Sequence, residues 1–519
     1  MRSPVALLLL ITAACAPGNE GARDANIITV AIRNGPNNLN PLVANDEFSA
    51  RVAQLVFSSL VDLGDDLRPR PVLARHIDNP DPLTYIVHLR RGVRFHDGRE
   101  LTARDVVYTY GLLLDPAFVS PYKGAYRMLA SVRALDDYTV EFRLKEPFAA
   151  FVGQLATPPV IPAGSVETLS EFPIGTGPYR FVRYDVDDQV VLSAFEGYYD
   201  GLPNNAGIIL KVIPDDTMRG LELRKGSIDL VINYMPPDIV HQLEQADGEF
   251  QIKRTPGLDL SYLAFNMRDP VLRDRRVRHA IAYAIDREAI VKYLRRDLAR
   301  VAAGILPPQV WAAEPDVHQF RYNPERARRL LDEAGYPDPD GDGPLPRLRL
   351  SLKVSTTEEV VLQATVIQGD LRRVGIDLDV RTYEFATFFA DVIKGNFQMY
   401  SLQWVGGALA DPDILNRLFH SRQVPPSGFN RGFYSNPDVD RLLELAGAAR
   451  TEPERKRYYA EVQKLIAWDA PYVPLWHRMN VIIARRDLTG LHLNPIGSYE
   501  SLKDVRRVGA TPSAAAPNP

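Results

Sequence analysis

Few residues of this chain have the types and spacing that metal-binding chemistry requires. The most metal-like stretch is Asp338-Pro-Asp340-Gly-Asp342-Gly343, where alternating aspartates precede a glycine as in a calcium-binding loop. The twelfth position of such a loop should hold a bidentate glutamate, and here it holds Arg349. Because Asp, Gly and Pro also favour turns, the stretch predicts a surface turn, with a weak structural calcium site as the alternative.

Short catalytic motifs are absent from the sequence. It contains no phosphate-binding P-loop, no dinucleotide-binding glycine fingerprint, no H-E-x-x-H zinc motif and no G-x-S-x-G nucleophile elbow. None of the nine histidines forms a ligand pair at helical spacing in a predicted helix. We therefore expect no enzyme, no catalytic residue and no cofactor, although a secreted hydrolase that uses carboxylates stays open as an alternative.

Length and composition indicate a globular protein with more than one lobe. The chain has 519 residues, of which 45% are hydrophobic and 24% charged, which excludes a disordered or multi-pass membrane protein. The net charge of −4 gives no basic excess for binding nucleic acid.

The lone cysteine, Cys15, ends an apolar run that follows Arg2 and is too short to span a bilayer. The run resembles a bacterial lipoprotein signal, in which Cys15 becomes the lipid-modified first residue of the mature chain. Thr12 departs from this pattern, because leucine is usual three residues before the cysteine. A secretory signal that is cleaved nearby, with Cys15 incidental, is the alternative.

Strand-like and helix-like segments alternate along the rest of the chain, which predicts α/β architecture with mixed sheets. Runs rich in β-branched and aromatic residues predict strands at 27–33, 85–90, 138–144, 179–184, 208–213, 258–267, 348–354, 377–383, 397–405 and 480–484. Helix starts are predicted at Thr102, Asp274, Asn323-Pro324 and Asn436-Pro437, and another helix at about 454–468. The apolar positions after Asp274 predict one helix that continues to Leu294.

Several collinear stretches resemble the family 5 extracellular solute-binding proteins, which are dipeptide, oligopeptide and nickel receptors of ABC importers. They include Leu39-Asn-Pro-Leu42, residues 85–108, Gly175-Thr-Gly-Pro-Tyr179, Leu263-Ala-Phe-Asn266, residues 277–287 and residues 322–335. The resemblance covers about residues 27–505.

The resemblance implies a two-lobed periplasmic-binding-protein fold of type II, cluster C, with an extra subdomain in lobe I. The expected divisions are a signal peptide (1–14), a lipid-anchored linker (15–25), lobe I (26–261, with the subdomain at about 42–174), lobe II (262–485), a return to lobe I (486–508) and a disordered tail (509–519). It implies a monomeric receptor, on the periplasmic or cell-surface side, that captures a peptide or peptide-like solute and delivers it to an ABC permease. A receptor of the same fold for a non-peptide solute, feeding a signalling or chaperone pathway, is the alternative.

Candidate ligand-binding residues follow strand ends and loops that the resemblance places at the cleft. They are Asn34, Asn38, Phe265, Asn266, Tyr383, Tyr400, Trp404, Asp411, Asn430 and Trp476. Several of them could equally be core or turn residues. In peptide-binding relatives, an aspartate shortly after the residue matching Trp404 holds the peptide ammonium, and Ala408 stands at that position here. Asp411 and Asp413 could replace it only if the loop is rebuilt.

Overall fold

The computed structural model describes residues 26–509, apart from 247, 342, 406, 408 and 427. The predicted signal peptide, Cys15 and most of the predicted tail lie outside the described residues, as do Asp342 and Ala408. No helix within the described part of the chain has the length and apolar character needed to cross a bilayer.

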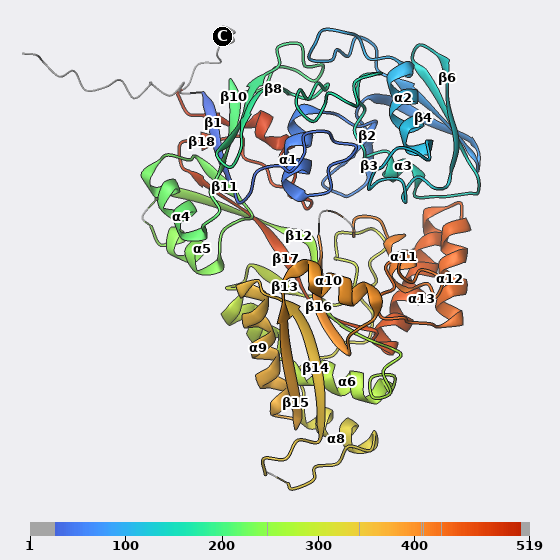
Figure 1. Ribbon diagram of the computed structural model, residues 1–519, viewed down its shortest axis with the longest axis vertical. Coiled ribbons are helices and arrows are strands. Elements are labelled where there is room, and N and C mark those ends of the chain that lie inside the picture. The colour runs from blue at the N-terminus through green and yellow to red at the C-terminus, as the bar shows by residue number, and fades with distance from the viewer. Residues whose placement is uncertain are drawn as a thin grey trace, which may run out of the picture.

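One mixed sheet runs through the whole molecule and joins its two lobes (Figure 1). From the lower to the upper end, its strands are β15 (Ile376–Tyr383), β14 (Leu348–Ser355), β16 (Met399–Trp404), β12 (Phe250–Phe265), β17 (Tyr472–Arg485), β11 (Leu230–Ile232), β1 (Ile27–Ile32), β10 (Gly207–Val212), β9 (Gln189–Ala194) and β8 (Tyr179–Asp185), with β13 (Ala299–Val301) paired to β17.

The two long strands β12 and β17 are the crossing between the lobes. The first half of β12 pairs only with the second half of β17, and its second half also pairs with β16. The pairing register of the two strands shifts between Pro256 and Leu260 of β12, opposite Met479 and His477 of β17. We place the crossing between the lobes at this irregularity. The predicted boundary at 261 lies close to this point. Residues 480–485, however, belong with the upper lobe and not with lobe II as predicted, because the end of β17 pairs with β11.

The helices cover both lobes. They are α1 (Glu47–Val56), α2 (Ala103–Leu114), α3 (Phe151–Gln154), α4 (Asp216–Lys225), α5 (Pro237–Glu244), α6 (Arg275–Ala284), α7 (Arg287–Ala289), the π-helix η1 (Ile290–Leu294), α8 (Pro324–Glu333), α9 (Glu358–Arg372), α10 (Phe385–Lys394), α11 (Ile414–Phe419), α12 (Pro437–Ala448), α13 (Glu452–Asp469) and the 3-10 helix η2 (Glu500–Asp504). The predicted helix starts are confirmed: Thr102 makes a capping box with Asp105, and Asn323 and Asn436 cap helices that begin with proline.

The prediction of one continuous helix from Asp274 to Leu294 is wrong. Helix α6 ends at Ala284, and Ile285 is extended. The Asp286 side chain then accepts a hydrogen bond from the Ala289 amide and starts a new turn.

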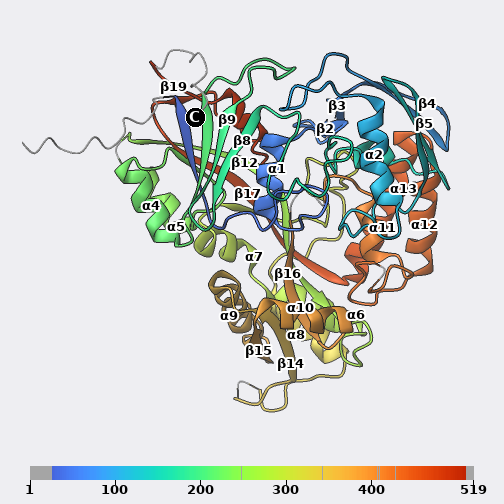
Figure 2. The same ribbon diagram turned by 45° about the horizontal axis from the view of Figure 1, so that its top comes forward.

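The extra subdomain has its own sheet and core. Its strands, in order, are β4 (Ala74–Asp81), β5 (Thr84–Leu89), β7 (Thr139–Leu144) and β6 (Leu129–Asp136), and helix α2 packs against them. Its buried cluster extends from Leu60 to Val160, whereas Leu42 and Leu169 belong to the main core of lobe I. In Figures 1 and 2 the subdomain lies opposite helices α11, α12 and α13 of lobe II.

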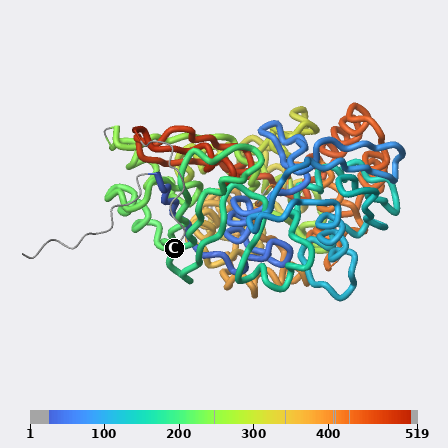
Figure 3. The backbone as a smooth tube through the Cα atoms, turned by 90° about the horizontal axis from the view of Figure 1, so that it is seen from above, coloured from blue at the N-terminus to red at the C-terminus, as the bar shows by residue number. Residues whose placement is uncertain are grey.

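Two short ladders complete the fold. The hairpin of β2 (Val61–Leu63) and β3 (Pro69–Pro71) connects lobe I to the subdomain, and β18 (Leu488–Thr489) pairs with β19 (Arg506–Arg507). The Asn205 amide donates to the carbonyls of Leu502 and Val505, which ties the returning chain to lobe I. Figure 3 shows this red C-terminal segment lying along the green part of the upper lobe.

Candidate functional site

A large cleft lies between the two lobes and is the candidate site. Its volume is about 1000 Å³, at the upper end of the range for small-molecule pockets. Lobe I lines it with α1, the β2–β3 hairpin and α3, and lobe II lines it with residues 407–417 and the start of α13. The described lining residues include no histidine, lysine or cysteine, so the serine hydroxyls there have no imidazole base beside them.

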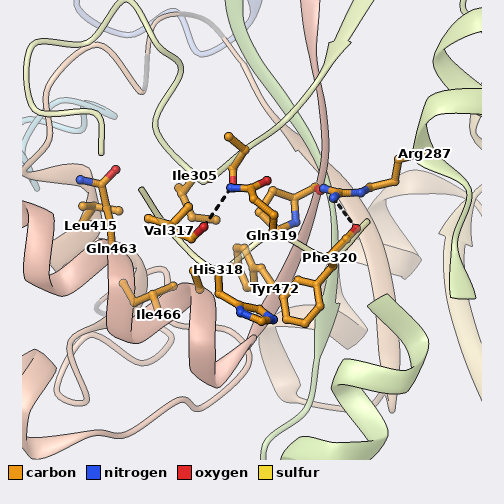
Figure 4. Close-up of a pocket in the computed structure, with 14 residues that line it drawn as sticks. Arg287, Ile305, Val317, His318, Gln319, Phe320, Leu415, Gln463, Ile466 and Tyr472 are labelled. Carbon is orange, nitrogen blue, oxygen red and sulfur yellow. Dashed lines mark hydrogen bonds between the residues drawn. The ribbon is translucent and has the colours of Figure 1, made fainter. Parts of the chain in front are cut away.

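A second pocket, shown in Figure 4, lies inside lobe II and is far smaller. Its walls come from residues 303–320, α11, α13 and β17. Arg287 donates to the Phe320 carbonyl at 2.7 Å across one wall. Its volume of about 20 Å³ holds roughly one water molecule, so the cleft is the better ligand site.

The β2–β3 hairpin bridges the mouth of the cleft. Leu67 at its tip is buried in the hydrophobic cluster of lobe II. Next to it, the Arg68 guanidinium forms two hydrogen bonds with the Glu452 carboxylate of α13, at 2.6 and 2.8 Å. The two lobes are therefore in direct contact on this side of the cleft.

Besides Glu452, the lobe II side of the cleft presents two carboxylates and two guanidinium groups. We call Asp411, Asp413, Arg417 and Arg455 the charged wall; all four line the cleft. The Asp411 carboxylate accepts from the Asp413 amide at 2.8 Å and lies 3.8 Å from the Arg455 guanidinium. Burial raises the pKa of Asp411, and burial together with the neighbouring Asp411 charge raises the pKa of Asp413 to about 6.

The lobe I side presents a second pair of carboxyl groups. Asp62, at the end of β2, forms a side-chain hydrogen bond with Glu500 at the start of η2. Burial is the largest cause that raises the pKa of Asp62 to about 7, and the hydrogen bond to Glu500 adds to it. Lys503 opposes this shift with its positive charge. The cleft thus has acidic groups on both sides, with Arg417 and Arg455 on the lobe II side and Arg68 on the lobe I side.

Asp411 is the one predicted ligand-binding residue that the structure places in the lining of this cleft. Gly407, which follows Trp404, also lines it and has the left-handed φ of +78° that favours glycine. A glycine there leaves the backbone accessible to a ligand at this loop.

Trp404 lies one layer behind the cleft and not in it. Only 8% of the residue is exposed, and its ring stacks on Tyr262 and packs near Phe429. The Arg431 guanidinium lies 4.9 Å from the ring centroid. That Trp404 contacts the ligand stays a prediction, and its position in this structure is behind the residues that line the cleft.

The other predicted residues do not gather at the cleft. Tyr400, Phe265 and Trp476 are fully buried, because β16, β12 and β17 are inner strands of the sheet. Asn266 and Asn430 are buried and use their amides to bond backbone carbonyls, including those of Phe397 and Tyr434.

The remaining three lie nearer the surface but outside the cleft lining. Asn34 is exposed, and the half-buried Asn38 accepts from the Asn40 amide and the Ser170 hydroxyl. Tyr383 is half-buried below the Lys353 ammonium. That they bind ligand stays a prediction.

The predicted calcium loop forms a turn where it is described. Asp338 pairs with Arg347 at 3.2 Å, and the Asp340 carboxylate accepts from the Leu345 amide at 3.0 Å. These partners occupy the two carboxylates, which favours the turn over the cation site.

Sequence reasoning missed seven charged lining residues: Asp46, Asp62, Arg68, Arg417, Glu452, Arg455 and Glu500. For Arg455 a signal was present. It stands on the same face of α13 as the buried Tyr459, Val462 and Ile466, at helical spacing. A charged residue within an apolar stripe indicates a buried charge that needs partners.

The cleft between two α/β lobes, joined by crossing strands, is the arrangement of a binding protein. The family model described as "Bacterial extracellular solute-binding proteins, family 5 Middle" matches residues 68–425. The chain belongs to this family. The resemblance and the two-lobed fold inferred from the sequence are thus confirmed.

Individual relatives of this family 5 protein cover nearly its whole length. It is 31% identical to the glutathione-binding protein GsiB of Escherichia coli strain K12, over 95% of this chain and 96% of that protein. It is 28% identical to heme-binding protein A of Haemophilus influenzae, over 87% of each chain. The oligopeptide-binding protein AppA from Bacillus subtilis, solved with a nonapeptide, is 27% identical and has a TM-score of 0.79, with 93% and 99% covered. All three of these relatives are named as binding proteins.

Proposed function

We propose that this protein captures a zwitterionic, peptide-like solute in the interlobe cleft and delivers it to an ABC permease. The observation that carries the proposal is the charged wall, which brings carboxylates and guanidinium groups together inside a cleft of peptide-binding size. Ligand-induced closure of two lobes about their crossing strands is the mechanism that this fold supports.

The chemistry of the wall matches both ends of such a solute. An ammonium group that leaves water needs a carboxylate partner, and Asp411 and Asp413 supply one. A carboxylate is bound best by a guanidinium group, and Arg417 and Arg455 lie on the same wall. Asp411 thus binds the ligand ammonium in place of the aspartate that peptide-binding relatives have at the position of Ala408.

The relatives support the same class of ligand. Glutathione, in the name of GsiB, carries an ammonium group and carboxylates, and AppA was solved with a nonapeptide. The ABC transporter-associated periplasmic binding protein DppA from Helicobacter pylori, 26% identical with a TM-score of 0.78, was solved with the peptide STSA.

The direct test is calorimetric titration of the purified protein with glutathione and with short peptides whose amine is free or acetylated. We expect the free-amine ligands to bind and the acetylated ones to bind weakly. The double variant Asp411→Asn/Asp413→Asn should lose at least about 2 kcal/mol of binding free energy, roughly 30-fold in Kd.

Asp377→Asn is the matched control, since Asp377 pairs with Arg349 on the exposed edge of lobe II, outside the cleft. Equal affinity of the double variant and the control for a free-amine peptide would refute the role of the wall. Binding of a non-peptide solute alone would favour the alternative receptor.

We further propose that Cys15 carries a lipid that anchors the protein on the periplasmic or cell-surface side of a membrane. The proposal rests on the signal-like sequence before Cys15. Expression of the full chain as Cys15→Ser should move it from the membrane to the soluble fraction. A mutant that still partitions with membranes contradicts lipidation at this residue.

A further inference from the structure

The outer face of the subdomain sheet carries two histidines and an aspartate on neighbouring strands. Along β5, Tyr85, Val87 and Leu89 point into the subdomain core, so His88 faces outward. His76 and Asp78 lie on β4, the edge strand beside it. We propose that His76, Asp78 and His88 bind a divalent cation of the Zn²⁺ type, at a site separate from the ligand cleft.

The strand register brings these side chains onto one face. Ala74 pairs with Leu89, and the register then shifts so that His76, and not Arg75, stands opposite His88. Without this β-bulge, the Arg75 cation would face His88. The bulge thus places an imidazole where a guanidinium would stand. Bulges re-aim side chains in this way next to functional sites.

The distances between the three ligand atoms are close to those of a bound metal. The Asp78 Oδ2 atom lies 3.1 Å from His88 Nε2 and 3.5 Å from His76 Nε2, and all three atoms lie within 4.8 Å of one another. Bonds of about 2.0–2.1 Å in a tetrahedral zinc site place neighbouring ligand atoms about 3.3 Å apart. Binding therefore requires the two imidazoles to move slightly closer and to rotate so that both Nε2 lone pairs point at one ion.

The two imidazole rings stack on each other, which keeps them side by side on the outer face. Their centroids are 4.2 Å apart with an interplanar angle of 13°. The next position across the ladder from His88 is Thr139, so β7 places no cation in that row. Two imidazoles and a carboxylate suit Zn²⁺, Ni²⁺ and Cu²⁺ better than Mg²⁺ or Ca²⁺.

The site is accessible and rigidly supported. Half or more of the His76 and Asp78 side chains is exposed, so a hydrated ion can reach them. Strand β5 is held between β4 and β7, which fixes His88 in place. Three protein ligands leave a fourth position for water or for a group on another molecule.

Another histidine–aspartate pair provides a matched control. His492 Nε2 lies 3.1 Å from Asp65 Oδ1, and both side chains are exposed to a similar degree. Among the described residues, His492 and Asp65 do not belong to any group of three possible metal ligands. It therefore has the same kind of contact without the third ligand.

The experiment is calorimetric titration of chelator-treated protein with ZnCl₂, with every variant carrying Cys15→Ser to remove the lone thiol. We expect one saturable site, weakened more than about 10-fold by His76→Ala or His88→Ala and unchanged by His492→Ala. Circular dichroism should show each variant folded, because all three residues are surface residues.

Two results would overturn the proposal: no saturable binding of Zn²⁺, or equal binding by the His76→Ala/His88→Ala double variant. The same proteins can be titrated with a peptide ligand. Since the cleft residues are untouched, peptide binding reports on the proposed function independently of the zinc result.

Discussion

Two neighbouring regions of lobe II differ in what they contribute: an aromatic layer and the charged wall in front of it. The aromatic layer consists of Tyr262, Tyr400, Trp404 and Tyr472, whose rings lie on the central strands behind the cleft. Tyr262 stacks between Tyr472 at 4.4 Å and Trp404 at 6.1 Å. The charged wall comes from a loop, from the short helix α11 and from the start of α13.

The difference shows how this protein divides stability from recognition. Burial of large rings stabilises the sheet, whereas partial burial of the carboxylates raises their pKa and works against folding. Side chains on a loop and on two helices therefore set the ligand chemistry, and the inner strands hold them in place.

The largest expected effect comes from removing a ring of the aromatic layer. Trp404→Ala should cost about 3–5 kcal/mol of unfolding free energy, because it leaves a cavity behind the cleft. Chemical denaturation followed by fluorescence measures it. Tyr383→Ala, at a half-buried strand end, is the control with a smaller loss. If Trp404→Ala kept the native stability but lost ligand affinity, the ring would be a ligand contact. The aromatic layer would then contribute to recognition as well as to stability.

A smaller, pH-dependent effect should come from Asp62 on the lobe I side. Its raised pKa means that the folded state binds a proton more tightly than the unfolded state, so Asp62 weakens folding as the pH rises from about 4 towards 7. Asp62→Asn should therefore raise the Tm at pH 8 relative to the unmutated protein and leave it nearly unchanged at pH 4.

Asp377→Asn again provides the control, since that carboxylate is exposed at the edge of lobe II. A Tm gain in Asp62→Asn that is the same at both pH values would contradict a titrating carboxyl pair in the cleft.

The smallest effect is expected at the interlobe pair of Arg68 and Glu452. Both side chains are about half-exposed, and exposed ion pairs contribute up to about 1 kcal/mol. Glu452→Gln should thus change ligand Kd by less than roughly 5-fold, and the difference should shrink in high salt. A larger loss that persists in high salt would mean that this pair controls closure.

The helix starts and most strand positions could be predicted because their signals are local. A capping side chain and a proline in the first turn act within a few residues, so Asn323 and Asn436 mark their helices in the sequence alone. Strands β4, β6 and β9 were not predicted, and neither were the short strands β2, β3, β11, β13, β18 and β19. The outer ends of β4 and β6 are mostly exposed, which leaves no apolar run to read.

The cleft residues were harder to predict, because their neighbours are remote in sequence. Glu500 approaches Asp62 only after the chain has crossed both lobes and returned. Trp404 ends a strand in a manner typical of a ligand contact, yet Tyr262 and Phe429, from other segments, cover its faces.

The sequence by itself determined the family, the two-lobed α/β fold and the local helix caps, since long collinear motifs and short-range capping carry that information. Only the tertiary structure decided which charges face the cleft and which aromatics stand behind it. It also decided that a bulge in β4 places His76 opposite His88. These outcomes depend on pairing register and on contacts between segments hundreds of residues apart, which no local pattern encodes.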